Sequence, residues 1–167
     1  MQLAVDAGAR VVAAASSDAK LALARELGAE VVVDYTRADW VERVREATGG
    51  GAALVYDGAG GALGTTSVDA VANGGRFVTY GTAGGFAAPD RESAARRGIR
   101  LFMPLMDGPP DRETARELLG LALESAAEGR LRPAIGATYP LARAADAHRA
   151  LAARTTVGKS LLLMDGE

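Results

Sequence analysis

The sequence predicts an α/β protein built on a Rossmann-like, doubly wound parallel sheet that is incomplete. Two general observations predict this fold. Strand-like runs of β-branched and apolar residues alternate with helix-like segments, and the links between them are short, which is the pattern of a parallel sheet wrapped by helices. The chain has 167 residues, of which 49% are hydrophobic and 24% are charged. This composition is typical of one globular domain, or of one domain and a fragment of another.

A third observation is the way the chain begins. The first residues have the pattern of the end of a helix, Gly8 stands where a glycine commonly terminates one, and Arg10–Ala15 follows as a short apolar strand. A parallel α/β unit opens with a strand and a glycine-rich turn before such a helix, so we expect both to be absent ahead of Met1. In the usual strand order the absent strand is central, between Arg10–Ala15 and Leu54–Asp57.

The alternating body is assigned to a partial dinucleotide-binding domain at residues 1–130. The predicted strands are Arg10–Ala15, Val31–Tyr35, Leu54–Asp57, Arg76–Tyr80 and Arg100–Leu105. The predicted helices are Asp18–Leu27, Ala38–Ala47, Leu63–Ala72 and Arg112–Ala127. Ser17 or Asp18 begins the first of these helices and Gly28 ends it, while two prolines and Asp111 precede the last one. Trp40 belongs to an amphipathic helix and is expected to pack in the core or at an interface.

The pattern changes after Gly129. A strand at Arg132–Tyr139, a helix at Ala142–Ala153 and a strand at Lys159–Met164 are predicted there. Residues 131–167 are therefore assigned to a structural unit separate from the body.

Charge and composition exclude several classes of function. The chain has 19 Lys and Arg residues against 21 Asp and Glu, and its longest basic run is the pair Arg96-Arg97, so we expect no binding to nucleic acid. No apolar stretch approaches the roughly 20 residues that cross a bilayer, and the N-terminus lacks the pattern of a signal peptide. We therefore expect no membrane partner and a cytoplasmic location.

Metal and nucleophilic chemistry are also poorly supported. The chain has no cysteine and one histidine, His148, which excludes thiolate zinc sites and imidazole-rich metal sites. We expect neither catalytic nor structural zinc, and we expect His148 to have a structural or surface role. No set of nucleophile, base and orienting group can be assembled, so the catalytic residues stay unassigned.

Several segments together resemble a known family. They are Ala14–Leu21, Ala24–Tyr35, Val44–Gly50 and Gly74–Gly81 in the body, and Tyr139–Leu151 with Val157–Leu163 in the tail. In order and spacing these segments resemble the medium-chain dehydrogenase/reductases, and specifically their zinc-independent quinone oxidoreductase branch. The resemblance implies a cofactor domain followed, from residue 131, by the last elements of a GroES-like substrate domain.

The stretch from Asp57 to Gly64 has the context of a phosphate-binding fingerprint, since it follows a strand and precedes a helix. It fails in register, because Leu63 stands where the third glycine is needed and no acidic residue closes the next strand. We interpret it as a later strand-to-helix turn. The resemblance implies that Asp57 and Gly58 flank the cofactor, and a plain turn that needs glycine is an equally open reading.

The residues after the first two strands favour NADPH over NADH. A dinucleotide-binding fold that prefers NADH places a carboxylate at the end of its second strand, which corresponds here to Arg10–Ala15. That carboxylate accepts hydrogen bonds from the ribose 2′-hydroxyl group. Here Ser16, Ser17 and Lys20 offer hydroxyl groups and a positive charge beside a helix N-terminus. By resemblance, Lys20 and Tyr35 match positions of the NADPH-using members. An ordinary solvated helix lysine is the alternative for Lys20.

A second group of candidates lies at Tyr80, Gly81 and Thr82, at the end of a strand that would approach the nicotinamide. By resemblance these residues border the nicotinamide or its ribose. A mobile loop with no ligand is the alternative.

The function that the resemblance implies is hydride transfer from NADPH to a small-molecule quinone or enone. Because a central strand and the glycine-rich turn are absent, we expect this chain not to turn over quinones and to bind the cofactor weakly. The alternative is a non-catalytic dinucleotide-binding or dimerisation module, and a flavodoxin-like regulatory domain is a weaker third reading. The apolar run Arg100–Met106 predicts an exposed edge strand, and a homodimer formed through it is the expected cover.

Overall fold

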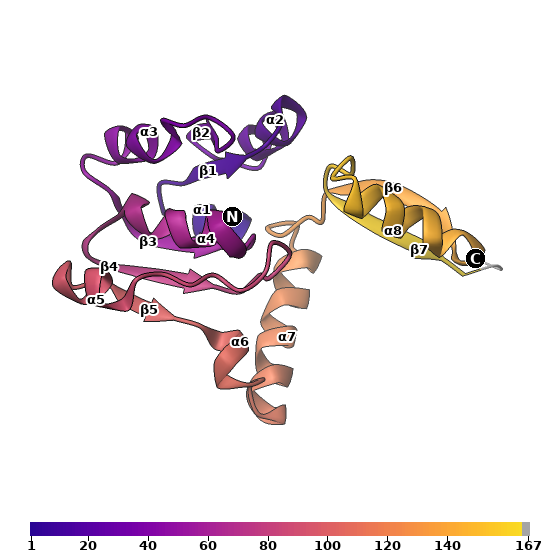
Figure 1. The fold of residues 1–167 in the computed structure, drawn as a ribbon. Helices are drawn as coiled ribbons and strands as arrows, with labels where there is room; N and C mark the ends of the chain where they lie inside the picture. The colour runs from indigo at the N-terminus through magenta and orange to yellow at the C-terminus, as the bar shows by residue number, and fades with distance from the viewer. Residues whose placement is uncertain (165–167) are drawn as a thin grey trace.

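The computed structural model describes residues 1–164, apart from the side chains of Leu105 and Asp107, and its strands form three separate parallel ladders (Figure 1). The first joins β1 and β2, the second has the order β3-β4-β5, and the third joins β6 and β7. The strands are β1 Val12–Ala15, β2 Val31–Asp34, β3 Ala52–Asp57, β4 Val71–Thr79, β5 Arg100–Phe102, β6 Ile135–Pro140 and β7 Lys159–Leu163. The predicted parallel α/β fold is confirmed.

Helices follow most strands, as the sequence predicts. They are α1 Gln2–Asp6, α2 Asp18–Glu26, α3 Trp40–Ala47, α4 Gly61–Ser67, α5 Arg91–Arg96, α6 Pro104–Asp107, α7 Arg112–Ala127 and α8 Ala144–Ala152, with short 3-10 turns η1 Val68–Ala70 and η2 Leu141–Arg143. Gly8 has φ +76° just after α1, a left-handed conformation that glycine adopts without steric cost. The predicted helix end at the start of the chain is therefore confirmed.

Two predicted elements have other bounds in the structure, and one helix was not predicted. The helix expected at Leu63–Ala72 begins earlier, at Gly61, and its last two residues belong to β4, which continues through a pair of glycines as an irregular strand. The strand expected at Arg100–Leu105 ends at Phe102 because Pro104 opens α6. Helix α5 was missed, although Asp90 is a clear N-cap signal that accepts hydrogen bonds from the backbone N–H groups of Glu92 and Ser93.

Two hydrophobic clusters hold the body together. One lies between the β3-β4-β5 sheet and the helices on one of its faces, and contains Val68, Val71, Phe77, Ala94 and Ile99. The other lies under α3 and contains Val33, Trp40, Val44 and Ala70. The second cluster joins the β1-β2 ladder to η1, so α3 and η1 connect the two ladders of the body. The core packing expected for Trp40 is confirmed.

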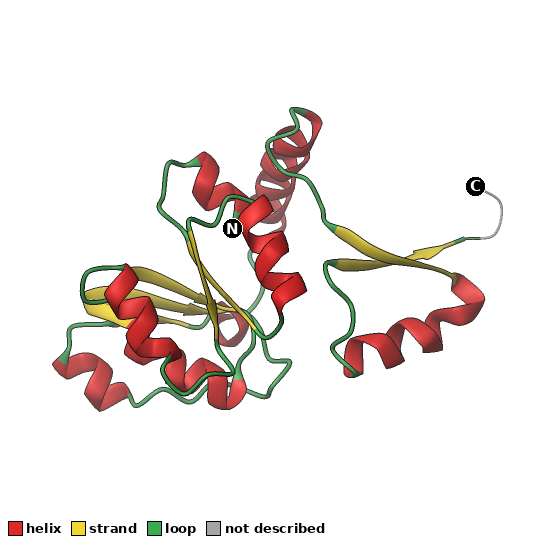
Figure 2. Ribbon diagram, turned by 90° about the horizontal axis from the view of Figure 1, so that it is seen from above, coloured by secondary structure: helices red, strands yellow, loops and turns green. Residues whose placement is uncertain are grey.

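The unit formed by β6, α8 and β7 extends away from the body (Figure 2). Polar contacts tie the segment that leads into it to α1: the Gln2 side chain makes two hydrogen bonds with the backbone of Arg132, and Arg130 pairs with Asp6 at 2.9 Å. Within residues 1–164, no helix is long and apolar enough to cross a membrane.

Candidate functional site

The residues predicted to select the cofactor meet at the carboxyl ends of β1 and β2. Ala15 pairs with Asp34 in the parallel ladder, and the backbone N–H of Tyr35 donates to Ala15 O at 3.1 Å. Ser16 is half-buried after β1, and Tyr35 is half-buried against the cluster under α3. The ladder register therefore places Tyr35 beside the serines, which the sequence alone could not establish.

Ser17 and Lys20 belong to the start of α2. Ser17 is the N-cap residue in an extended conformation, and its side chain makes no capping hydrogen bond. The hydroxyl group therefore remains available to a ligand at the helix N-terminus, where the helix dipole favours an anion. The Asp18 carboxylate in the same turn opposes that preference, so the positive charge of Lys20 is the feature that favours a phosphate there.

The Lys20 side chain is half-buried, and its Nζ donates to the backbone carbonyl of Arg154 at 3.1 Å. Arg154 follows α8 and has φ +56°, a left-handed conformation that is uncommon outside glycine. This contact brings the loop between α8 and β7 against the start of α2. Sequence reading missed Arg154, because nothing local to its position signals a contact with a residue so distant in the chain.

An acidic residue, Asp34, lies at the end of β2, but its carboxylate is engaged locally. Asp34 Oδ1 accepts hydrogen bonds from Thr36 N at 2.9 Å and from Thr36 Oγ1 at 2.7 Å. Both bonds lower the pKa of Asp34 below its ordinary value of 3.8, and the bond from the Thr36 N–H group has the larger effect. The group is therefore an ionised part of the turn that carries Tyr35.

The second group of candidates lies at the carboxyl ends of β3 and β4, and Asp57 holds it in place. The Asp57 carboxylate is buried; its Oδ1 accepts from Ala59 N and Gly60 N, both at 2.9 Å, and its Oδ2 accepts from Thr79 Oγ1 at 2.8 Å. It thereby fixes the turn between β3 and α4 and ties it to β4. Asp57 has a structural role, while the position of Gly58 beside it is open to a ligand that flanks the turn.

Two glycine-rich loops pack backbone against backbone at this edge. Gly61 N donates to Gly85 O, and Gly84 N donates to Ala59 O, both at 2.8 Å. A Cβ added at Gly81 would overlap the carbonyl group of Gly58. Glycine at this position is therefore required by close approach of the two loops.

The same contacts test the rejected phosphate fingerprint. The backbone N–H groups of Ala59 and Gly60 are taken by Asp57, and that of Gly61 by Gly85. None of these three backbone N–H groups is left to donate to a pyrophosphate. The interpretation of this stretch as a later strand-to-helix turn is confirmed.

Tyr80 stands over this turn and is open to solvent. Its ring lies 6.4 Å from that of Tyr56, edge to face, and the two side chains are 57% and 63% exposed. A Cβ added at Gly58 would contact the Tyr80 hydroxyl group, so the end of this side chain lies against one side of Gly58, which is otherwise exposed. Thr82 is exposed and Gly81 is half-buried beside it. The structure thus gathers Asp57, Gly58 and Tyr80–Thr82 into one cluster.

The two clusters lie on different ladders. The Lys20 cluster, which we define as Ser16, Ser17, Lys20 and Tyr35, is carried by β1 and β2; the glycine-loop cluster, Asp57, Gly58 and Tyr80–Thr82, is carried by β3 and β4. Within residues 1–164, no strand pairing joins β1 to β3. The residues of each cluster lie together, but in the described part of the chain no strand connects the two clusters.

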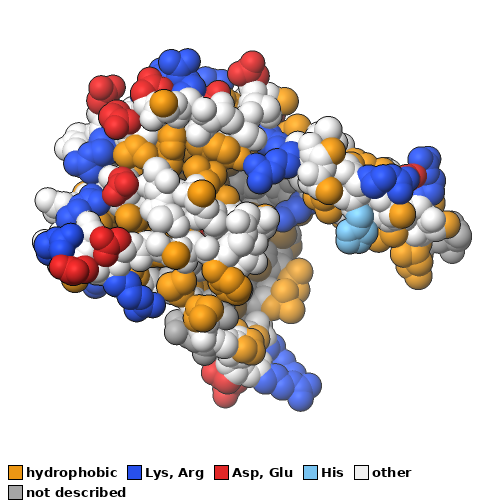
Figure 3. Space-filling model, in the orientation of Figure 1, with side chains coloured by type: hydrophobic (Ala, Val, Ile, Leu, Met, Phe, Trp, Pro, Cys, Tyr) orange, Lys and Arg blue, Asp and Glu red, His pale blue; other side chains and the backbone are white. Residues whose placement is uncertain are grey.

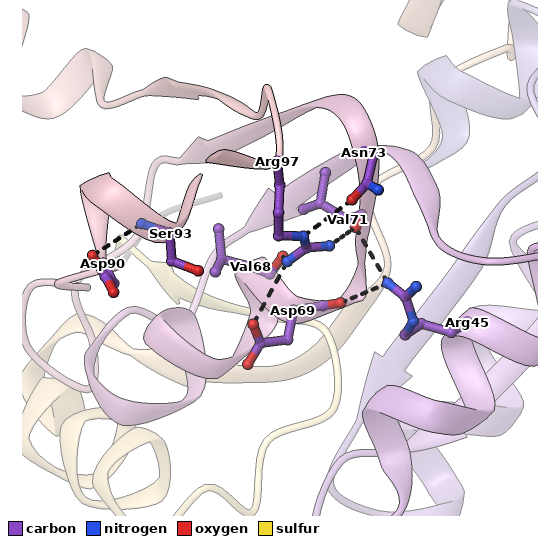
Figure 4. Close-up of polar contacts among 8 residues, drawn as sticks. All are labelled: Arg45, Val68, Asp69, Val71, Asn73, Asp90, Ser93 and Arg97. Atoms are coloured by element: carbon purple, nitrogen blue, oxygen red, sulfur yellow. Dashed lines mark hydrogen bonds and ion pairs between the residues drawn. The ribbon is translucent and has the colours of Figure 1, made fainter. Parts of the chain in front are cut away.

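A separate hollow of about 490 Å³ lies beside α3 and η1 and is lined in part by Arg45, Asp69 and Arg97. Figure 4 shows that both guanidinium groups point at the backbone around η1. Arg45 donates to Asp69 O at 3.1 Å, while Arg97 donates to Val68 O, Val71 O and the Asn73 side chain. These arginines hold the end of η1 in place, and Asp69 also pairs with Arg97 at 3.7 Å. We assign this hollow a structural role.

No group of three or more His, Cys, Asp or Glu side chains is placed to hold a metal ion in the described part of the chain. His148 is exposed on α8 (Figure 3). Its surface role stays a prediction.

Comparison with known proteins identifies relatives. Residues 1–123 match the profile of the zinc-binding dehydrogenase family. The chain is 32% identical over 161 residues to the 2-haloacrylate reductase of a Burkholderia species, covering 93% of this chain and 48% of that protein. It is 34% identical over 164 residues to the quinone oxidoreductase of Pseudomonas aeruginosa, covering 93% of this chain and 49% of the relative.

A solved mycobacterial structure, determined in complex with NADPH, superposes with a TM-score of 0.86 at 34% identity. The superposition covers 97% of this chain and 52% of the mycobacterial one. The chain thus spans about half the length of the curated relatives it matches.

Proposed function

Because the chain belongs to the zinc-binding dehydrogenase family, among the medium-chain dehydrogenase/reductases related to quinone oxidoreductases, we propose that it is part of an NADPH-dependent oxidoreductase. The reaction is hydride transfer to an electron-poor quinone or enone. The family name mentions zinc, but the chain has no cysteine and one histidine, a donor set that does not fit a zinc site. The roles proposed below for residues of this chain involve no metal.

The observation that carries the proposal is the Lys20 cluster. The half-buried residue Lys20 lies in the first turn of α2, near Ser17, whose hydroxyl group makes no capping hydrogen bond. Strand β1 ends at Ala15 and is followed by Ser16. A ribose 2′-hydroxyl has no carboxylate partner at the end of β1, whereas a 2′-phosphate meets a charge and hydroxyl donors. Asp34 stands at the end of the neighbouring strand β2 and not of β1, and both groups of Thr36 bind its Oδ1.

Arg154 borders the same proposed site. Its backbone carbonyl takes one of the three donors of Lys20 Nζ, which leaves two for a phosphate, and the contact places the loop after α8 beside the start of α2. We include Arg154 among the residues that border the 2′-phosphate.

The glycine-loop cluster forms the other end of the proposed site. Gly58 and Thr82 are exposed at this edge, and the exposed ring of Tyr80 beside them offers a flat apolar surface to a planar ring. The bound nicotinamide supplies the hydride. In this proposal Tyr80, Gly81 and Thr82 border the nicotinamide and its ribose, Gly58 lines the turn, and Asp57 fixes the turn.

The domain division and the assembly are parts of the same proposal. Residues 1–130 form the partial cofactor domain, and residues 131–167 the end of a GroES-like substrate domain. A homodimer forms along β5, whose outer edge has no partner strand within residues 1–164 and whose Phe102 is 43% exposed. The expected cytoplasmic location stays a prediction.

The test is a pair of titrations, one with NADPH and one with NADH. NMR monitors binding up to millimolar concentrations of each cofactor. The unmodified chain is expected to bind NADPH more tightly, and Lys20→Ala to reduce the ratio of the two affinities about tenfold or more, because a charge-assisted phosphate contact is lost. Lys159→Ala is the matched control, because Lys159 is the other lysine of the chain and lies on β7. An unchanged ratio in Lys20→Ala overturns the assignment.

Turnover separates the proposal from a non-catalytic binding module. We expect no NADPH oxidation with a simple benzoquinone by this chain alone. A version extended by a strand, a glycine-rich turn and a substrate domain is expected to be active. Comparable rates from both versions would contradict the placement of the cofactor, and an inactive extended version would favour the binding module.

A further inference from the structure

Helix α8 ends in a cap that is usually built around a glycine. After the last helical residue, Ala152, the Arg154 N–H donates to Leu151 O at 3.0 Å. The Thr155 N–H donates to Ala150 O at 3.1 Å. These are the two bonds of a Schellman motif, and Arg154, with φ +56°, occupies its left-handed position. An arginine therefore stands where a side chain carries a steric cost that glycine avoids.

The cap presents its backbone to Lys20. Lys20 Nζ donates to the Arg154 carbonyl at 3.1 Å, and Lys20 is half-buried in the first turn of α2. The C-terminal end of a helix carries a partial negative charge, which favours a cation there. The backbone conformation of Arg154 sets the direction of its carbonyl group, so the position of the ammonium group depends on the cap.

The bond to Arg154 restrains Lys20 without exhausting its donors. A lysine ammonium group has three donors, and Arg154 O takes one of them. A freely solvated lysine loses much rotamer freedom when a ligand fixes it, and this loss weakens binding. A carbonyl group that already restrains the side chain removes part of this cost before the ligand arrives. The cap of α8 therefore favours binding of a phosphate at Lys20.

The restraint comes from a different unit of the fold. Lys20 belongs to the body, on α2, whereas Arg154 follows α8 in the unit formed by β6, α8 and β7. Within residues 1–164, β6 and β7 pair with each other and with no strand of the body. The lysine of the proposed phosphate site is thus held by a segment that lies outside the sheets of the body.

We propose that the cap of α8, Arg154 and Thr155, positions Lys20 through the Arg154 carbonyl, so that preference for a 2′-phosphate depends on the β6-α8-β7 unit. This inference rests on the proposed function, since it concerns the same lysine. Arg154 acts here through its backbone, as a positioning residue. Because coupling between two sites is reciprocal, a bound phosphate in turn stabilises the cap.

The test compares two substitutions that both remove the guanidinium group. Arg154→Gly allows the left-handed conformation without steric cost, whereas Arg154→Val disfavours it, because a β-branched residue rarely adopts a positive φ. NMR titrations give the affinities for adenosine 2′,5′-bisphosphate and for 5′-AMP, and their ratio isolates the 2′-phosphate. We expect this ratio to be lower by about threefold or more in Arg154→Val than in Arg154→Gly. Arg154→Asn, which also tolerates the left-handed region, is expected to keep the higher ratio.

Three further readouts separate positioning of Lys20 from a general loss of structure. Carbon-13 relaxation at Lys20 Cε, measured without ligand, should show a more mobile side chain in Arg154→Val than in Arg154→Gly. The affinity for 5′-AMP should be the same in both variants. By reciprocity, saturating bisphosphate should slow amide hydrogen exchange at Thr155 in the unmodified chain by about threefold or more.

Equal affinity ratios in Arg154→Val and Arg154→Gly, or equal mobility of Lys20 in the two variants, would overturn the positioning role. A matching fall in the affinity for 5′-AMP would overturn it as well, because the cap would then act on the fold and not on Lys20. These outcomes contradict this inference alone. An unmodified chain that shows no preference for the bisphosphate over 5′-AMP would overturn the proposed function and, with it, this inference.

Discussion

The Lys20 cluster and the glycine-loop cluster differ in what holds them. At the ends of β1 and β2 the candidate groups are side chains, half-buried or exposed, and the ammonium group of Lys20 makes one hydrogen bond to a distant carbonyl. At the ends of β3 and β4 the geometry is set by backbone: two loops of glycine in direct contact, fixed by one buried carboxylate.

This difference indicates which substitutions should change ligand binding and which should change the stability of the fold. Substitutions of Ser16, Ser17 and Lys20 should change which ligand binds and leave the fold intact, because these side chains lie outside the two hydrophobic clusters, whereas Tyr35 packs on one of them. Substitutions in the glycine-loop cluster should cost stability first, because no space exists between its loops. The predictions below test this contrast from the largest expected effect to the smallest.

The largest effect is expected from Gly81→Ala. The added Cβ overlaps the Gly58 carbonyl, and backbone on both sides leaves no flexible group to yield, so we expect a loss of about 3 kcal/mol in the free energy of unfolding. Urea denaturation measures this loss. Gly120→Ala in α7 is the control: its Cβ meets nothing within 4 Å, and the change is expected to stabilise by about 0.5–1 kcal/mol. Equal stabilities of the two variants would contradict the close packing.

A smaller loss is expected from Asp57→Ala, which leaves Ala59 N, Gly60 N and the Thr79 hydroxyl group without their acceptor. We expect about 2 kcal/mol of destabilisation. Asp57→Asn is the matched variant, because the amide keeps one oxygen for the two N–H groups and should lose less. The urea midpoints of the two variants give the comparison. An Asp57→Ala chain as stable as the unmodified one would show that the carboxylate does not hold the turn.

The smallest effect concerns the pH response of Asp34, in the turn that carries Tyr35 of the Lys20 cluster. Its pKa is lowered by the two bonds from Thr36, so its contribution to stability is complete above the ordinary pKa of 3.8 and is lost as the pH falls through the lower pKa of the folded state. The carboxyl chemical shift in NMR should titrate with a midpoint below 3.8. Thr36→Val removes the hydroxyl donor and should move the midpoint upward. A midpoint at or above the ordinary value would contradict the turn geometry.

Sequence reading recovered the fold where a local pattern decided it. The apolar runs at β1 and β2, the glycine after α1 and the prolines before α7 each act within a few residues, and α7 was predicted with its observed bounds, Arg112–Ala127. The failures arose where tertiary contacts decided the outcome. β4 continues through Gly74 and Gly75 because β3 pairs with it before the glycines, at Val71, and again after them, from Arg76, although glycine pairs usually mark a turn.

The candidate site divides in the same way. The sequence proposed Lys20, Ser16 and Ser17 as candidates from their place after a strand, and this stays a prediction; the approach of Arg154 depends on how a distant loop packs. Asp57 was expected beside the cofactor, and its three hydrogen bonds reveal a structural role that no spacing could have shown.

The most direct test of the two-cluster account is an NMR titration that maps shift changes onto residues. Adenosine 2′,5′-bisphosphate is expected to shift Ser16, Ser17, Lys20 and Tyr35 alone, while NADPH is expected to shift these and also Gly58, Gly81 and Thr82. That result would place the phosphate end and the nicotinamide end of one ligand on the two clusters. Shifts confined to the hollow between Arg45 and Arg97, or an NADPH response that spares the Lys20 cluster, would contradict the account.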